Sequence, residues 1–219
     1  MSNKGQGGID LAGDKARALS LTPVSRETLA RLEAYVELLL RWQQTTNLIS
    51  PATIPHLWTR HVADSLQILG LAPDATTWVD LGSGGGFPAI PIACALTGKP
   101  GAMVHLVESN GKKAAFLREA IRVTGAPAQV HAERIEKYID ATVKSVDVVT
   151  ARALAPLKTL CDQAFPLLER GAIGLFAKGL DVDTELTEAS KYWKLEVQKV
   201  PSKTSADGCI VIVRNLKPQ

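Results

Sequence analysis

The chain has 219 residues, of which 46% are hydrophobic, and its formal net charge is only +3. This length suits one domain with a small addition, and the apolar content is enough to fill a sizeable core. The sequence contains no run of 18 apolar residues, so we expect no membrane span. The N-terminus lacks the apolar centre of a signal peptide. The low net charge neither requires nor excludes a nucleic-acid partner, which would need a local basic face.

The three cysteines, Cys94, Cys161 and Cys209, are widely spaced and odd in number. Because no C-x-x-C pair occurs, the sequence predicts neither a disulfide framework nor a metal centre. Free cysteines are typical of the reducing cytoplasm, where we expect the protein.

The first third of the chain is expected to be helical after a disordered start. Its beginning is rich in Gly, Ser and Asn, so residues 1–20 are predicted to form a disordered tail. Thr22 and Pro23 predict a helix start, and apolar residues at helical spacing continue that helix for about twenty residues. A second helix is expected over 53–69. Residues 21–72 would then form an N-terminal helical extension.

Strands and helices alternate in the rest of the chain. The expected strands are 77–81, 104–107, 128–131, 146–150, 173–177, 195–200 and 209–214, and the expected helices are 87–96, 112–123, 134–140, 156–168 and 182–192. The alternation predicts a doubly wound α/β sheet of seven strands in a domain spanning residues 73–219. The last two strands are separated by too few residues for a parallel crossover, so we expect them to pair antiparallel.

The segment between the first expected strand and the next helix carries the clearest functional signal. Asp80 is followed by glycines at alternate positions, Gly82, Gly84 and Gly86. A strand, a glycine turn and a helix start allow backbone N–H groups to approach a nucleotide-like ligand. The second expected strand ends at Glu108, where a carboxylate is placed to bind a ribose diol. These features indicate a nucleoside-bearing cofactor.

Three interpretations of the glycine turn stay open at this point. The dinucleotide fingerprint G-x-G-x-x-G fails when counted from Gly82, and counted from Gly84 it begins three residues past the strand and contains Pro88. The alternating pattern is similar to the S-adenosylmethionine loop of class I methyltransferases, which we favour. A plain glycine turn without a ligand is the third interpretation.

Motifs spread from about residue 21 to about residue 214 resemble one family closely. They include Tyr35-x-x-Leu-Leu-x-x-Trp42 with Asn47-Leu48, Arg60-His61-x-x-Asp64-Ser65, Asp80-Leu-Gly-Ser-Gly-Gly-Gly-Phe-Pro88, Glu108-Ser109-x-x-Lys112-Lys113, Arg134-x-Glu136, Thr150-Ala-Arg152-Ala153 and Lys178-Gly179. The family is RsmG, also called glucose-inhibited division protein B, whose members are bacterial small-subunit rRNA guanine-N7 methyltransferases. The chain departs from the family pattern at Ala89, where glycine is usual, and at Cys209-Ile210, where arginine or histidine is common.

The resemblance implies a Rossmann-like class I methyltransferase fold with S-adenosylmethionine as the cofactor. It implies small-subunit (16S) rRNA as the partner, within the 30S subunit. We expect a monomer that binds neither a membrane nor a metal ion.

The resemblance also implies which residues contact the cofactor. They are Asp80, Gly82, Gly84, Gly86, Phe87, Glu108, Ile135, Glu136 and Arg152. Glu108 has the strongest claim, because two carboxylate oxygens match two ribose hydroxyls. For Asp80 a structural role at the strand end is an equal alternative, and for Phe87 a place in the core at the helix start is another.

The expected rRNA contacts are His61, Lys112, Arg118, Arg134 and Lys178. Lys112 and Arg118 lie on one expected helix, and such a basic run is as often a solvated face as a phosphate-binding one. His61 belongs either to a polar wall over the cofactor or to a buried structural cluster.

The residues around the fourth expected strand narrow the chemistry. No cysteine follows that strand, as methylation of a pyrimidine C5 would require. The Asp/Asn-Pro-Pro-aromatic motif of exocyclic-amine methyltransferases is replaced by Thr150-Ala-Arg152. Guanine N7 has a lone pair and no proton, so it can attack the methyl group in line without a general base. We expect Arg152 to be the catalytic group that positions the guanine.

Two other function classes stay as alternatives. One is a non-enzymatic rRNA-binding or ribosome assembly factor with a degenerate glycine turn. The other is an NAD-dependent oxidoreductase built on the same kind of sheet.

Overall fold

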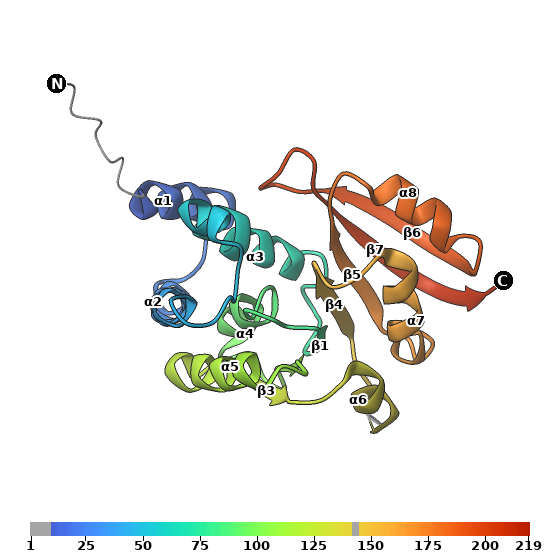
Figure 1. The fold of residues 1–219 in the computed structure, drawn as a ribbon, viewed down its shortest axis with the longest axis horizontal. Coiled ribbons are helices and arrows are strands. Elements are labelled where there is room, and N and C mark those ends of the chain that lie inside the picture. Colours follow the sequence, from blue (N-terminus) through green and yellow to red (C-terminus); the bar gives the residue numbers. More distant parts are fainter. Residues whose placement is uncertain (1–9, 142–144) are drawn as a thin grey trace.

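A seven-stranded sheet forms the centre of the protein (Figure 1), seen in a computed structural model that describes residues 10–141 and 145–219. The strands are β1 (Thr77–Leu81), β2 (Met103–Val107), β3 (Ala128–His131), β4 (Val148–Arg152), β5 (Ile173–Lys178), β6 (Trp193–Pro201) and β7 (Cys209–Pro218). Their order is β3-β2-β1-β4-β5-β7-β6. Strands β1 to β5 pair parallel, and β7 runs antiparallel to both β5 and β6. The predicted mostly parallel sheet with a reversed last strand is therefore confirmed.

Helices cover both faces of the sheet and divide the core into two apolar clusters. One face carries α4 (Ala89–Leu96) and α5 (Gly111–Thr124), and the other carries α6 (Ile135–Ala141), α7 (Leu157–Leu168) and α8 (Val182–Ala189). Buried strand residues such as Val79 and Leu106 point to one cluster or the other. Because both faces are covered, the strands are almost continuously apolar, as parallel strands require.

A further layer of helices packs on the outer side of α4 and α5 (Figure 1). This N-terminal layer consists of α1 (Leu11–Leu21), α2 (Arg26–Gln43), a 3₁₀ helix (Pro51–His56), a π-helix (Trp58–Ala63) and α3 (Asp64–Leu69). Its apolar residues belong to the same core cluster as α4 and α5. The layer is therefore part of the domain's core rather than a separate appendage.

The start of the chain differs from the expectation. The disordered tail predicted over 1–20 is wrong for residues 11–20, which form α1; residues 1–9 lie outside the described part. Asp10 caps α1 by accepting a hydrogen bond from Gly13 N at 2.8 Å. Asp14 also accepts from the backbone N–H of Trp58 at 2.7 Å, which ties the helix to the rest of the layer. The Gly-rich start of the chain concealed a helix that the Asp10 cap and tertiary contacts of Asp14 support.

The helix starts in the N-terminal layer also need correction. Thr22 ends α1, because its backbone N–H binds Ala18 O, and α2 begins after Ser25, whose hydroxyl accepts from Thr28 N at 3.1 Å. The single helix predicted over 53–69 is three short segments of different pitch. The wider π turn contains His61, and such turns are frequent at functional sites.

Strand β4 lies two residues later than predicted, so Arg152 is its last residue rather than the residue beyond it. Strand β7 also continues to Pro218 instead of ending near Arg214. No helix among the described residues is long and apolar enough to cross a membrane.

Candidate functional site

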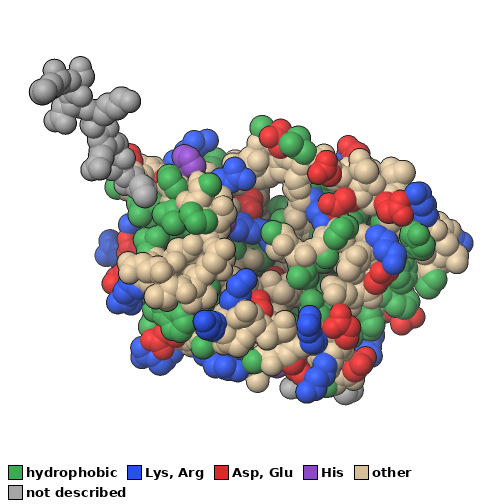
Figure 2. Space-filling view, in the orientation of Figure 1, with side chains coloured by type: hydrophobic (Ala, Val, Ile, Leu, Met, Phe, Trp, Pro, Cys, Tyr) green, Lys and Arg blue, Asp and Glu red, His purple; other side chains and the backbone are tan. Residues whose placement is uncertain are grey.

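Two neighbouring cavities open at the edge of the sheet where the parallel strands end. The first cavity has a volume of about 570 Å³ and is bordered by the ends of β1, β2 and β4. The second has a volume of about 730 Å³ and is bordered by the ends of β4 and β5 and by the β6–β7 loop. Figure 2 shows this face hollowed between the N-terminal layer and the C-terminal hairpin, with charged side chains inside the hollow.

The glycine turn forms the floor of the first cavity. Gly82 and Gly84 line it, and both have positive φ angles, 68° and 52°, which glycine adopts without strain. Gly86 also has a positive φ, but it does not line the cavity. A Cβ on Gly86 would lie 2.9 Å from the Tyr35 hydroxyl, so this glycine makes room for α2. The structure does not bring Gly86 to the predicted cofactor contact.

Glu108 follows β2 and is almost fully buried in the wall of the first cavity. One carboxylate oxygen accepts from Gly84 N at 2.8 Å, and the other accepts from Asn110 N at 2.7 Å. These bonds fix the carboxylate, and each oxygen keeps a lone pair for another donor. Ile135, at the start of α6, adds an apolar surface to the same cavity, and Glu136 and Arg134 lie at its border. This arrangement suits a ribose and an attached base.

Asp80 lies beneath the glycine turn and lines neither cavity. Its side chain is buried; one oxygen accepts from the Thr150 hydroxyl at 2.7 Å, and the other has no partner. Burial raises the pKa of Asp80 to about 6, although the Thr150 hydrogen bond opposes the shift. The unpartnered oxygen is suited to a cationic or N–H group entering above the turn.

The wall between the two cavities is built around Arg152. Its guanidinium donates to Asp64 Oδ2 at 3.2 Å and to the Arg60 carbonyl at 3.0 Å, and it contacts His61 Nδ1. It also lies over the Phe87 ring, 5.4 Å from the centroid. A guanidinium has five N–H donors, so some stay available to a ligand in either cavity.

His61 is held neutral in this wall. Burial, together with the positive charges of Arg152 and Arg60, lowers the pKa of His61 to about 3. Because a guanidinium can only donate, Nδ1 is the acceptor and Nε2 carries the proton, which points to the Thr53 hydroxyl at 2.8 Å. Both ring nitrogens are therefore occupied within the protein.

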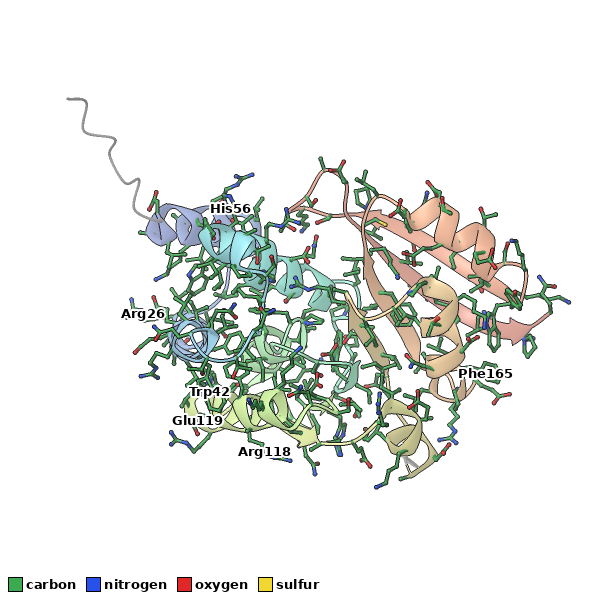
Figure 3. The ribbon with its side chains drawn as sticks, viewed as in Figure 1. Arg26, Trp42, His56, Arg118, Glu119 and Phe165 are labelled. Carbon is green, nitrogen blue, oxygen red and sulfur yellow. The ribbon has the colours of Figure 1, made fainter. Side chains whose placement is uncertain are left out.

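The expected RNA-binding residues are not all brought to the site. Arg134 borders the first cavity, whereas Lys112 and Arg118 are exposed on α5 and line neither cavity. Arg118 lies on the outer side of α5 (Figure 3). Lys178 lines the second cavity, but it pairs with Glu185 at 2.6 Å and donates to Ala155 O at 2.7 Å. Its charge is neutralised inside the protein, which indicates a structural role.

Sequence reasoning missed two loops that complete the cavities. Leu48 and Ile49, after α2, border the first cavity, and Gln43 holds them through their backbone groups at 2.8–3.1 Å. The β6–β7 loop borders the second cavity, and Gln67 and Asp64 hold it from α3. Gln43 continues the apolar stripe of Val36, Leu39 and Leu40 on α2, and this polar residue in an apolar stripe was the sequence signal for the first loop.

The two departures from the family pattern have different surroundings. Ala89 is buried at the start of α4, where its methyl group packs in the core. Cys209 lines the second cavity at the start of β7 and pairs with Lys178 across the sheet.

Comparisons with known proteins agree on one family. A family model described as rRNA small subunit methyltransferase G matches residues 28–211. A relative from a Bradyrhizobium species, named ribosomal RNA small subunit methyltransferase G, is 62% identical over 203 residues, covering 93% of this chain and 91% of its own. A relative of the same name from Rhodopseudomonas palustris is 61% identical over 210 residues, covering 96% and 90%.

Solved structures share the fold at much lower identity. A putative O-methyltransferase from Klebsiella pneumoniae has a TM-score of 0.61 and 12% identity, covering 93% of this chain and 96% of that one. An O-methyltransferase from Bacillus cereus in complex with SAH has a TM-score of 0.60 and 13% identity, covering 93% and 97%. These likenesses establish the methyltransferase architecture of the sheet and its covering helices.

Proposed function

Because the chain belongs to the rRNA small subunit methyltransferase G family, we propose that it methylates N7 of one guanine in small-subunit rRNA. The chain is an S-adenosylmethionine-dependent methyltransferase. The guanine, its N7 atom and a transfer without a general base are the proposed part. The observation that carries this part is the absence of a free proton acceptor on the described wall between the cavities.

The first cavity fits S-adenosylmethionine. We propose that Glu108 binds the ribose hydroxyls, Ile135 contacts the adenine, and the backbone at Gly82 and Gly84 contacts the methionine end, since all four residues line this cavity. When bound, this cofactor supplies an electrophilic methyl group on a sulfonium ion.

The side chains between the cavities are not suited to remove a proton from a substrate. His61 has a pKa of about 3, and both of its nitrogens are already hydrogen bonded. Asp80 lies behind the turn, out of reach of a substrate in the second cavity. Such a site suits a methyl acceptor that loses no proton during the reaction. Guanine N7 is a nucleophile of this kind.

Arg152 is placed to position the guanine. Its remaining N–H groups can donate to the guanine O6, which lies beside N7. Asp64 at 3.2 Å balances the charge of Arg152, which reduces its repulsion of a sulfonium and of a methylated, cationic base. The contribution to rate is then orientation and electrostatics.

Basic residues around the cavities support an RNA partner. Lys113 and Arg134 border the first cavity and Arg60 borders the second, and none of these side chains has an ion-pair partner in the described part of the chain. Lys112 lies beside them on α5. Unpaired cations around a concave site are suited to phosphates, which position a nucleic acid without reading its sequence. We expect the substrate within the 30S subunit.

The test uses small subunits purified from a strain that lacks this gene. They are incubated with the protein and methyl-labelled S-adenosylmethionine, and labelled guanines are mapped by chain cleavage at 7-methylguanine. One labelled guanine in small-subunit rRNA is the expected result. Measurable cofactor binding without label in the rRNA would refute the proposed substrate.

The other function classes lose their support. Membership of a methyltransferase family removes the basis for an NAD-dependent oxidoreductase. A cavity with glycines and Glu108 in binding positions also speaks against a factor with a degenerate turn.

A further inference from the structure

We infer that a methyl acceptor approaches from the second cavity. The two cavities share the wall formed by Thr53, His61, Arg152, Ala153 and Leu154. In-line transfer needs direct contact between the acceptor atom and the methyl carbon, so the two ligands meet beside these shared residues. The acceptor atom therefore lies against the wall, and the rest of the acceptor extends into the second cavity.

Apolar side chains at the second cavity suit the faces of a base. Leu154 and Leu180 line it, and they are 36% and 76% exposed. Together they present apolar surface at the mouth of a cavity that also carries charged groups. Enzymes that methylate a base in a structured nucleic acid take that base out of its stack, which bares two apolar faces. The two leucines are placed to cover those faces.

Three carboxylates line the second cavity, and two of them are occupied. Asp64 binds Arg152 and accepts from the Thr204 hydroxyl at 2.8 Å. Glu185 pairs with Lys178 and accepts from a backbone N–H. Asp207, in the β6–β7 loop, has no hydrogen-bond or ion-pair partner among residues 10–141 and 145–219. It is therefore the carboxylate that is free to bind a ligand there.

We propose that Asp207 selects the acceptor base by accepting hydrogen bonds from N1–H and N2–H of guanine. Guanine presents these two adjacent donors, whereas adenine has an acceptor at N1 and no amino group at C2. The N1–N2 edge lies on the side of the purine away from N7. Asp207 lines the second cavity only, so it faces the base from the side away from the shared wall. This inference rests on the proposed function.

The loop that carries Asp207 is fixed from the N-terminal layer. Gln67 accepts from the backbone N–H of Lys203 at 2.8 Å and donates to Asp64 at 2.7 Å. Figure 1 shows the hairpin loop reaching toward α3. Since Asp64 also binds Arg152, one buried network places both walls of the second cavity. These bonds fix the first half of the loop, and Asp207, in its second half, is exposed and able to meet a ligand.

The experiment is a double-mutant cycle that changes Asp207 in the protein and the N2 amino group of the target base in the rRNA. Wild-type protein and the Asp207→Asn variant are assayed on small subunits whose target position carries guanosine or inosine. Inosine keeps N7, O6 and N1–H but lacks the N2 amino group. Asp74→Asn is the matched control, because Asp74 is exposed at the opposite edge of the sheet and has no partner among the described residues.

We expect the wild type to prefer guanosine by about tenfold in kcat/KM, the value of one lost base contact. The Asp207→Asn variant should lose this preference, and Asp74→Asn should keep it. The preference is a ratio within each enzyme, so a general loss of activity does not obscure it. A wild type that treats both nucleosides alike, or an Asp207→Asn variant that keeps the preference, would overturn the role of Asp207. Failure of the proposed function would instead appear as no methylated guanine with the wild type.

Discussion

The two cavities are built in different ways. The first is built mainly around a glycine turn after β1 and a carboxylate after β2, only a few residues from their strands, and the Leu48–Ile49 loop covers it. The second gathers side chains from the π-helix, α3, the ends of β4 and β5, and a hairpin loop more than a hundred residues from α3. A site built from backbone leaves a motif in the sequence, whereas a site built from distant side chains does not.

In each cavity, one glutamine side chain holds the covering loop by hydrogen bonds to its backbone. Gln43 holds the loop that covers the first cavity, and Gln67 holds the loop that covers the second. Arg152 belongs to both cavities, because it lies in the wall between them. Variants at these positions test whether the cavities serve separate ligands.

The largest effect is expected from removing the shared wall. Arg152→Ala should lower the rate of rRNA methylation by about 100-fold or more, because the acceptor loses its orientation. Binding of the cofactor, measured by calorimetry, should change far less. Arg26→Ala, on the exposed start of α2 (Figure 3), is the matched control. Methylation at the wild-type rate by Arg152→Ala would show that the wall does not position the acceptor.

A smaller effect is expected from a change confined to the first cavity. Glu108→Gln replaces one acceptor oxygen by an amide that faces a backbone N–H, and charge-assisted bonds to the ribose are lost. The Kd for S-adenosylhomocysteine should rise about tenfold to 100-fold. The KM for small subunits should stay close to the wild-type value. Glu169→Gln, at the end of α7, serves as the control, and equal Kd values in the two variants would contradict the assignment.

The glutamine pair should separate the two ligands. Gln43→Ala should raise the KM for S-adenosylmethionine and Gln67→Ala the KM for small subunits, each by about threefold to tenfold, the value of a lost hydrogen bond or two. Each variant controls for the other, since both remove the same side chain. If both variants raise the same KM, the cavities do not work separately.

The smallest effect concerns the stability of the floor beneath the first cavity. The pKa of Asp80 is raised to about 6 from its usual 3.8, so its contribution to stability is present below about pH 4 and is lost as the pH rises through 6. The difference in the free energy of unfolding between Asp80→Asn and the wild type should therefore shift by about 1 kcal/mol in favour of the variant as the pH rises from 5 to 7.5. Urea unfolding at both pH values measures this difference, and an unchanged difference would contradict the raised pKa.

The contribution of the wall residue His61 to stability depends on pH in the opposite direction. Its pKa is lowered from 6.5 to about 3, so its contribution is present above about pH 6.5 and is lost as the pH falls towards 3. Unfolding of His61→Gln at pH 5 and pH 7.5 should show less loss of stability on acidification than the wild type. A steeper loss in the variant would contradict a neutral His61.

The order of strands and helices and the position of the first cavity were predictable, because hydrophobic period and glycine turns act over short distances. Helix α1 was not, since the Gly-rich start of the chain predicted a tail and the hydrogen bonds of Asp14 to the π-helix leave no pattern in the sequence. Gly86 was assigned to the cofactor although it accommodates Tyr35, because spacing cannot tell which side of a turn is crowded. Lys178 was expected to contact rRNA because no sequence pattern indicated its ion pair with Glu185, which lies on the next helix, α8.

The hydrogen bond from the Tyr35 hydroxyl to the Gly85 carbonyl has a consequence for how the protein is made. The helices that emerge first from the ribosome hold half of a contact whose other half is synthesised fifty residues later. Their apolar faces stay without a partner until α4 and α5 follow. We therefore expect a fragment that begins at residue 73 to lack a properly shaped glycine turn, however complete its sheet.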